Sequence, residues 1–89
     1  MTKAERQQVY QQELAILSEK MDKQQAYFDE LWAFADKHGG DNIPPEHQAA
    51  WLKCRINGRT PWRKRRAVVK RVEASARKMA KNKIKRAES

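Results

Sequence analysis

The chain has 89 residues, enough for one small domain, and its 20 Lys and Arg residues outnumber its 11 Asp and Glu residues. This size excludes an enzyme with a large enclosed pocket. No apolar run approaches the roughly 20 residues of a membrane span, and the single Cys54 cannot form an internal disulfide. We therefore expect a cytoplasmic protein without a membrane partner, in the host cytoplasm if a phage encodes it.

The first predicted element is a long amphipathic helix over about residues 4–38. This range holds no Gly or Pro, and Gly39 is suited to end the helix. Apolar side chains recur at alternating steps of four and three once Gln24 is counted, which predicts a packing seam. The seam residues are Tyr10, Leu14, Leu17, Met21, Phe28 and Leu31. The seam has two candidate partners: the later helices of this chain, or a second copy in a homodimeric coiled coil.

A second, shorter helix is predicted over about residues 44–57. Asp41 or Asn42 is placed to cap it, two prolines fit its first turn, and Gly58 can end it. Its apolar residues fall on two faces, one with Ala49, Leu52 and Ile56, the other with Ala50, Trp51 and Cys54. A short helix that is apolar on two faces is expected to be buried.

A third, basic amphipathic helix is predicted over about residues 61–82, with Thr60 as its cap and Pro61 at its first position. Residues 83–89 offer little to bury, so we expect a frayed, flexible basic tail. The predicted fold is therefore all-α, with residues 1–82 as one small domain. In it, residues 1–38 form a packing or dimerisation helix and residues 42–82 a basic helical hairpin.

Charge is unevenly divided along the chain. Residues 1–38 carry five basic and seven acidic side chains, whereas residues 39–89 carry fifteen basic and four acidic ones. Such a split is typical of one segment for folding and another for a polyanion. The basic segment could also be a solvated face, but so dense a charge of one sign repels itself. A polyanion offsets that cost because its counterions are released on binding.

The segment from Thr60 to Arg66 carries four cations where the third helix should begin. A helix N-terminus disfavours cations, but an incoming phosphate would reverse that preference. We predict a nucleic-acid-binding surface made of Arg59, Arg63, Lys64, Arg65, Arg66, Lys70, Arg71, Arg77, Lys78 and Lys81. Trp62 could stack on a base, although its place on the same arc as Val69 favours the core.

Metal binding and catalysis are not expected. His47 and Cys54 would lie about 10 Å apart on one helix, too far to share a metal ion. The sequence also lacks a Cys–His or Ser–His pairing and a Gly-rich phosphate loop. We therefore predict a protein that is not an enzyme and needs no cofactor.

The leading hypothesis is a small protein that grips the phosphate backbone of nucleic acid. DNA is slightly favoured over RNA, because a rigid basic helix suits a major groove and aromatic RNA-stacking motifs are missing. The turn at Asn57–Thr60 also permits a helix-turn-helix, although no diagnostic residue beyond its glycine supports one. A membrane-surface helix is a weaker alternative, because the apolar arc of the third helix is mostly Val and Ala.

The main alternative is an accessory or inhibitor protein, as phages and plasmids encode, that binds a host nucleic-acid-processing enzyme. Such a protein should bury one of its exposed aromatic side chains in the partner, and the candidates are Tyr10, Tyr27 and Trp32.

Overall fold

The computed structural model of the chain describes residues 1–88 and is built on one long helix, α1 (Lys3–His38). The helix begins with a capping box: Glu5 N–H donates to Thr2 Oγ1, and Thr2 N–H donates to Glu5 Oε1, both at 3.2 Å. Gly39 ends it with a φ of 90°, a conformation that favours glycine. The predicted first helix is thus confirmed within one residue.

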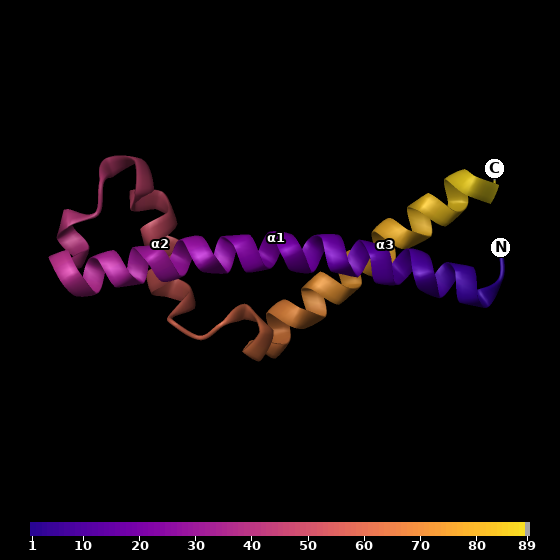
Figure 1. Ribbon diagram of the computed structural model, residues 1–89, viewed down its shortest axis with the longest axis horizontal. Helices are drawn as coiled ribbons and strands as arrows, with labels where there is room; N and C mark the ends of the chain where they lie inside the picture. The colour runs from indigo at the N-terminus through magenta and orange to yellow at the C-terminus, as the bar shows by residue number, and fades with distance from the viewer. Residues whose placement is uncertain (89) are drawn as a thin grey trace.

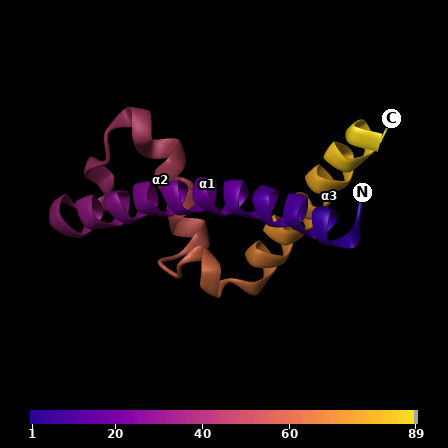
Figure 2. The same cartoon turned by 45° about the vertical axis from the view of Figure 1, so that its right-hand side comes forward.

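The other two helices cross opposite ends of α1. Helix α2 (Gln48–Asn57) lies against its C-terminal half, and α3 (Arg66–Glu88) against its N-terminal half (Figures 1 and 2). The molecule is elongated, 54 × 24 × 16 Å, and both chain ends lie at the same end of α1 (Figure 1). The all-α fold with three helices is as predicted, and none of the helices within residues 1–88 is long and apolar enough to cross a membrane.

One hydrophobic core joins α1 to α2 and to the connection between them. This connection contains two 3-10 turns, η1 (Gly40–Asn42) and η2 (Pro45–His47). The buried core residues are Phe28, Leu31, Ile43, Trp51 and Cys54. The rings of Trp32 and Trp51 meet edge to face, with centroids 4.8 Å apart. Each large apolar side chain buried here contributes roughly 1.5–3 kcal/mol.

Three features of α2 differ from the prediction. The helix begins at Gln48 instead of near residue 44, because Pro45–His47 forms the separate turn η2. Asn42 does not cap α2; its side-chain amide donates instead to the carbonyl of His38 at the end of α1. Moreover, α2 is buried on one face only, because α1 is the only other helix that packs against it in the described chain. Trp51 lies on the buried face, while Leu52 is 57% exposed and Ile56 is 84% exposed.

A second contact region joins α1 to α3. Val72, Ala76 and Ala80 are buried at one-turn spacing, and the two alanines let the helix backbones approach closely. Across from them Glu13 of α1 is only 1% exposed, and its carboxylate forms an ion pair with Lys83 Nζ. A carboxylate can be buried this deeply only when it is paired, so Lys83 is needed to complete the interface.

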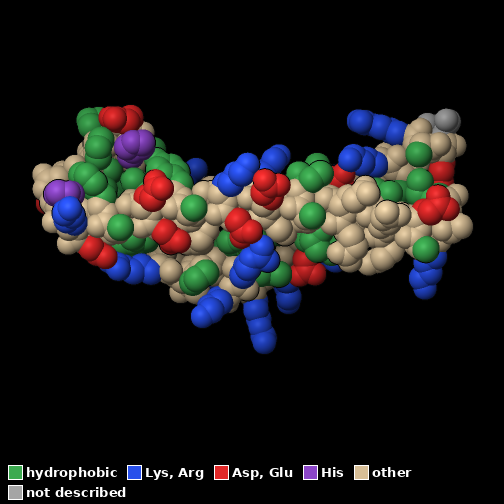
Figure 3. Space-filling model, viewed as in Figure 1, with side chains coloured by type: hydrophobic (Ala, Val, Ile, Leu, Met, Phe, Trp, Pro, Cys, Tyr) green, Lys and Arg blue, Asp and Glu red, His purple; other side chains and the backbone are tan. Residues whose placement is uncertain are grey.

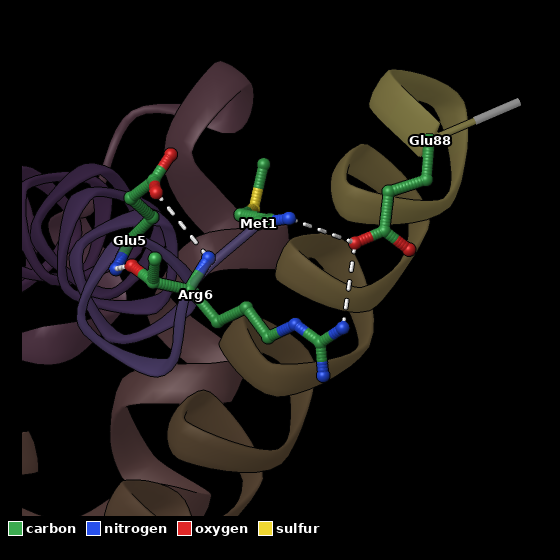
Figure 4. Close-up of polar contacts among 5 residues, drawn as sticks. Met1, Glu5, Arg6 and Glu88 are labelled. Carbon is green, nitrogen blue, oxygen red and sulfur yellow. Dashed lines mark hydrogen bonds and ion pairs between the residues drawn. The ribbon is translucent and has the colours of Figure 1, made fainter.

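Helix α3 continues to Glu88, whereas the prediction ended it near Asn82 with a frayed tail. Glu88 Oε1 lies 3.3 Å from Arg6 Nη2 and 3.9 Å from the Met1 amino group, so the start of α1 holds the end of α3 (Figure 4). Ile84 is half-buried in the same region. The predicted tail was wrong for residues 83–88 because local composition does not show that α1 covers this turn. Ser89 lies outside the described residues.

Candidate nucleic-acid interface

The outer face of α3 carries a row of exposed cations. With 100° per residue, these side chains lie away from the Val72–Ala76–Ala80 stripe that packs on α1. They are Lys70, Arg71, Arg77, Lys78 and Lys81, and we call them the outer cations. Within residues 1–88 none of them has an ion-pair partner. Of the two carboxylates in α3, Glu73 is half-buried at the edge facing α1, and Glu88 pairs with Arg6.

The segment before α3 is held against α1 by one aspartate. Asp22 accepts hydrogen bonds from Trp62 Nε1 and from Arg63 Nη2, both at 2.9 Å. Gln25 Oε1 accepts a third from the Trp62 backbone N–H at 3.0 Å. The hydrogen bond from Arg63, followed by that from Trp62, lowers the pKa of Asp22. Trp62 is only 4% exposed, so it belongs to the core and does not offer a stacking surface.

This attachment changes where α3 begins. Trp62–Lys64 forms a 3-10 turn, η3, after Pro61, and Thr60 caps no helix. Arg65 follows in an extended conformation, with φ −94° and ψ 100°. The prediction that these four cations occupy the first turn or two of the third helix was therefore wrong, since only Arg66 belongs to α3. The connection 58–65 is also longer than the three or four residues of a helix-turn-helix.

Arg59 is likewise engaged with α1. Its guanidinium binds both carboxylate oxygens of Asp36, with Nη1 2.9 Å from Oδ2, and lies 4.4 Å above the ring of Trp32. The hydrogen bonding lowers the pKa of Asp36 and raises that of Arg59. Arg59 and Arg63, two of the predicted phosphate-binding residues, thus have carboxylate partners within the chain.

Arg65 lines a groove between α1 and α3 together with two further cations, Lys20 and Arg71. The groove has a volume of about 490 Å³. Sequence reasoning missed Lys20, because it belongs to the acidic half of the chain. No sequence signal could have found it, since the crossing of α3 over α1 alone brings it beside Arg65. The remaining predicted cations, Lys64 and Arg66, are exposed at the start of α3.

The predicted seam packs within this chain. Phe28 and Leu31 are buried, and Tyr10, Leu14, Leu17 and Met21 are half-buried. The seam packs against two helices: its C-terminal part contacts α2, and the remainder lies along α3. The hydroxyl group of the half-buried Tyr27 forms a hydrogen bond with His47 Nδ1 at 2.6 Å.

Figure 3 shows how these groups are distributed on the face that α1 presents. Asp and Glu side chains are scattered along α1, while long Lys and Arg side chains project beyond the edge of the molecule. Among residues 1–88 no three His, Cys, Asp or Glu side chains gather closely enough to hold a metal ion. Comparison with protein families, curated proteins and solved structures finds no match to this chain.

Proposed function

We propose that this chain binds nucleic acid, without catalysis, by gripping the phosphate backbone with the outer cations of α3. The observation that carries the proposal is the absence of ion-pair partners for these five side chains within the described residues. Aspartates of α1 pair instead with Arg59 and Arg63. A row of unpaired cations on one helix is a costly arrangement that phosphates relieve through counterion release.

The shape of α3 favours a duplex. At 1.5 Å per residue, its 23 residues span about 34 Å, close to one turn of a double helix. Asp22 fixes the segment before the helix to α1, and the Glu13–Lys83 pair and Arg6 fix the C-terminal part of the helix. Little ordering entropy is then lost on binding. Duplex DNA is our first choice, because a rigid helix can enter its major groove and the narrow major groove of RNA excludes one.

The test is fluorescence anisotropy with labelled duplex DNA, single-stranded DNA and RNA at several salt concentrations. We expect submicromolar binding that weakens steeply with salt, with duplex DNA bound best. Replacing Lys70, Arg77 and Lys81 together by Gln should reduce the slope of log affinity against log salt by about 3, roughly 0.9 for each lost phosphate contact.

The matched control replaces Lys3, Lys37 and Lys53 by Gln. These three lysines are exposed, lie outside α3 and have no ion-pair partner in the described chain, so the net charge changes equally. The control should keep most of the wild-type slope. Equal losses in the two triple variants would mean that net charge alone drives binding, and weak binding of all three probes near physiological salt would refute the proposal.

A second candidate function is docking to a protein, such as a nucleic-acid-processing enzyme. The three aromatic side chains predicted for this role are half-buried within the chain. The observation that favours docking is instead the exposed pair Leu52 and Ile56 on α2, next to Lys53 and Arg55, which would suit an acidic surface. Replacing Leu52 and Ile56 by Ser should abolish capture of such an enzyme while leaving nucleic-acid binding unchanged.

A further inference from the structure

The groove between α1 and α3 is cationic at its rim and apolar at its floor. Lys20, Arg65 and Arg71 contribute its positive charges, and no carboxylate lines it. The three cations come from α1, from the residue before α3 and from α3 itself. Their side chains converge only because the two helices cross here, and they lie beside the outer cations, with which they share Arg71.

Arg65 is the most unusual of the three. Its side chain is half-buried, and its Nε is fully buried without a hydrogen-bond partner. A buried donor left unpaired is costly and calls for an explanation. Because the side chain of Arg65 is half-buried and lines the groove, its guanidinium lies there before any ligand arrives. A guanidinium placed in this way is suited to a phosphate, which it can bind through two parallel hydrogen bonds.

The floor of the groove indicates more than a phosphate. It is formed by Leu17, Met21, Val68 and Val72, all at least half-buried. A phosphate alone gains nothing from an apolar floor, whereas the flat face of a base does. The rim adds polar side chains that have no hydrogen-bond partner within residues 1–88 and can reach a base edge: Gln24, Asn57 and Ser75.

From these features we infer that the groove binds one unpaired nucleotide of the nucleic acid that α3 holds, with its phosphate on Lys20, Arg65 and Arg71 and its base on the apolar floor. The inference rests on the proposed function. The volume of about 490 Å³ lies within the usual range of small-molecule sites. A nucleotide in a single-stranded overhang reaches the groove without unstacking a base pair, so an overhang should be preferred to a blunt end.

The test compares a blunt duplex with duplexes of the same sequence that carry a three-nucleotide single-stranded overhang, at the 5′ end in one probe and at the 3′ end in another. Affinities are measured by fluorescence anisotropy at one salt concentration. We expect the wild-type chain to prefer an overhang by about tenfold, the gain typical of one charge-assisted hydrogen-bonded contact. The readout is the affinity for an overhang duplex divided by the affinity for the blunt duplex. Binding by the outer cations is common to both kinds of probe and cancels in this ratio.

Two pairs of matched variants locate the effect. Ser75→Phe should fill the groove and bring the ratio near one, whereas Asn82→Phe, two turns further along the same side of α3 and outside the groove, should leave it unchanged. Arg65→Ala should lower the ratio and Arg66→Ala should not. Lys20→Gln is a third groove variant, exposed on α1, that tests the ratio without disturbing packing. Circular dichroism checks that each variant stays helical.

The outcomes separate the groove from the proposed function. Tight binding of both kinds of duplex with a ratio near one in the wild type would overturn the groove inference and leave the proposed function intact. A ratio that Ser75→Phe and Lys20→Gln do not change would overturn it as well. Absence of binding to any duplex would refute the proposed function, and the inference with it. Flotation with anionic phospholipid vesicles that Ser75→Phe abolishes would assign the groove to a lipid instead.

Discussion

The cations between α2 and α3 and the cations of α3 itself are alike in chemistry and differ in their partners. Arg59 and Arg63 bind Asp36 and Asp22 of α1 and lie over the rings of Trp32 and Trp62. The outer cations, which lie further along the chain on α3, are exposed and form no ion pair with a carboxylate of the described chain. The first set holds the connection to the long helix, and the second remains free for a ligand.

This difference teaches that charge density along a sequence does not by itself locate a binding surface. The acidic residues of α1 are spread along its length, but within residues 1–88 only Asp22 and Asp36, beside the α2–α3 connection, form an ion pair with an arginine. A cation's function therefore depends on whether the crossing of the helices places a carboxylate next to it.

The largest expected effect comes from Trp62→Ala, which removes the main anchor of the connection. Loss of a buried Trp side chain should cost about 3–5 kcal/mol, and it also removes the indole hydrogen bond to Asp22. Thermal unfolding followed by circular dichroism should show a midpoint lowered by well over 10 °C, since about 1 kcal/mol shifts a domain of this size by roughly 4–8 °C. Leu52→Ala on the exposed face of α2 is the control, with an expected change within about 0.5 kcal/mol. Similar midpoints for the two variants would mean that Trp62 is not an anchor.

The next effect concerns Lys83, a cation of α3 that pairs with the buried carboxylate of Glu13. Lys83→Met leaves Glu13 buried and unpaired, which should cost about 1–3 kcal/mol in urea unfolding. Replacing both residues by Met should restore most of the loss, because an apolar pair avoids the burial of charge. Lys78→Met, on the outer face, is the control. If the double variant is less stable than Lys83→Met alone, the buried carboxylate is not the cause of the loss.

Much of the fold followed from the sequence because it depends on local signals. A helix-forming run ended by Gly39 predicted α1, and the seam predicted which of its faces would be buried. The glycine at 58, with a φ of 72°, ends α2 as expected. Trp62 was assigned to the core from its place on the apolar arc of the third helix, and it is buried although it precedes α3.

The errors arose where a distant residue decides the local structure. Pro61 was expected to begin α3, but Asp22 and Gln25 hold Trp62 on α1, so the helix begins only at Arg66. The face of α2 with Ile56 was expected to be buried, but in the described chain neither α1 nor α3 covers it. The groove could not be predicted either, because Lys20 and Arg65 are distant in sequence and adjacent only through the crossing of α1 and α3.

A smaller effect is expected from pH. The pKa values of Asp22 and Asp36 are lowered in the fold by their arginine partners. Since the ordinary value is about 3.9, the stabilisation is present in full above that pH and is lost as the pH falls through the lowered values. The unfolding midpoint should therefore fall as the pH drops below about 4, and the double variant Asp22→Asn, Asp36→Asn should flatten this dependence. An equally steep fall in the double variant would assign it to other carboxylates.

The smallest effect tests the comparison most directly, one cation at a time. Lys70→Gln should reduce the salt slope of duplex binding by about 0.9, the value for one lost phosphate contact. Arg59→Gln makes the same change in net charge but removes an arginine that is already bound to Asp36, so the slope should stay within error of the wild type. Anisotropy at five or more salt concentrations resolves this difference. A slope lowered equally by Arg59→Gln would show that Arg59 leaves Asp36 for a phosphate, and that the two sets of cations act as one surface.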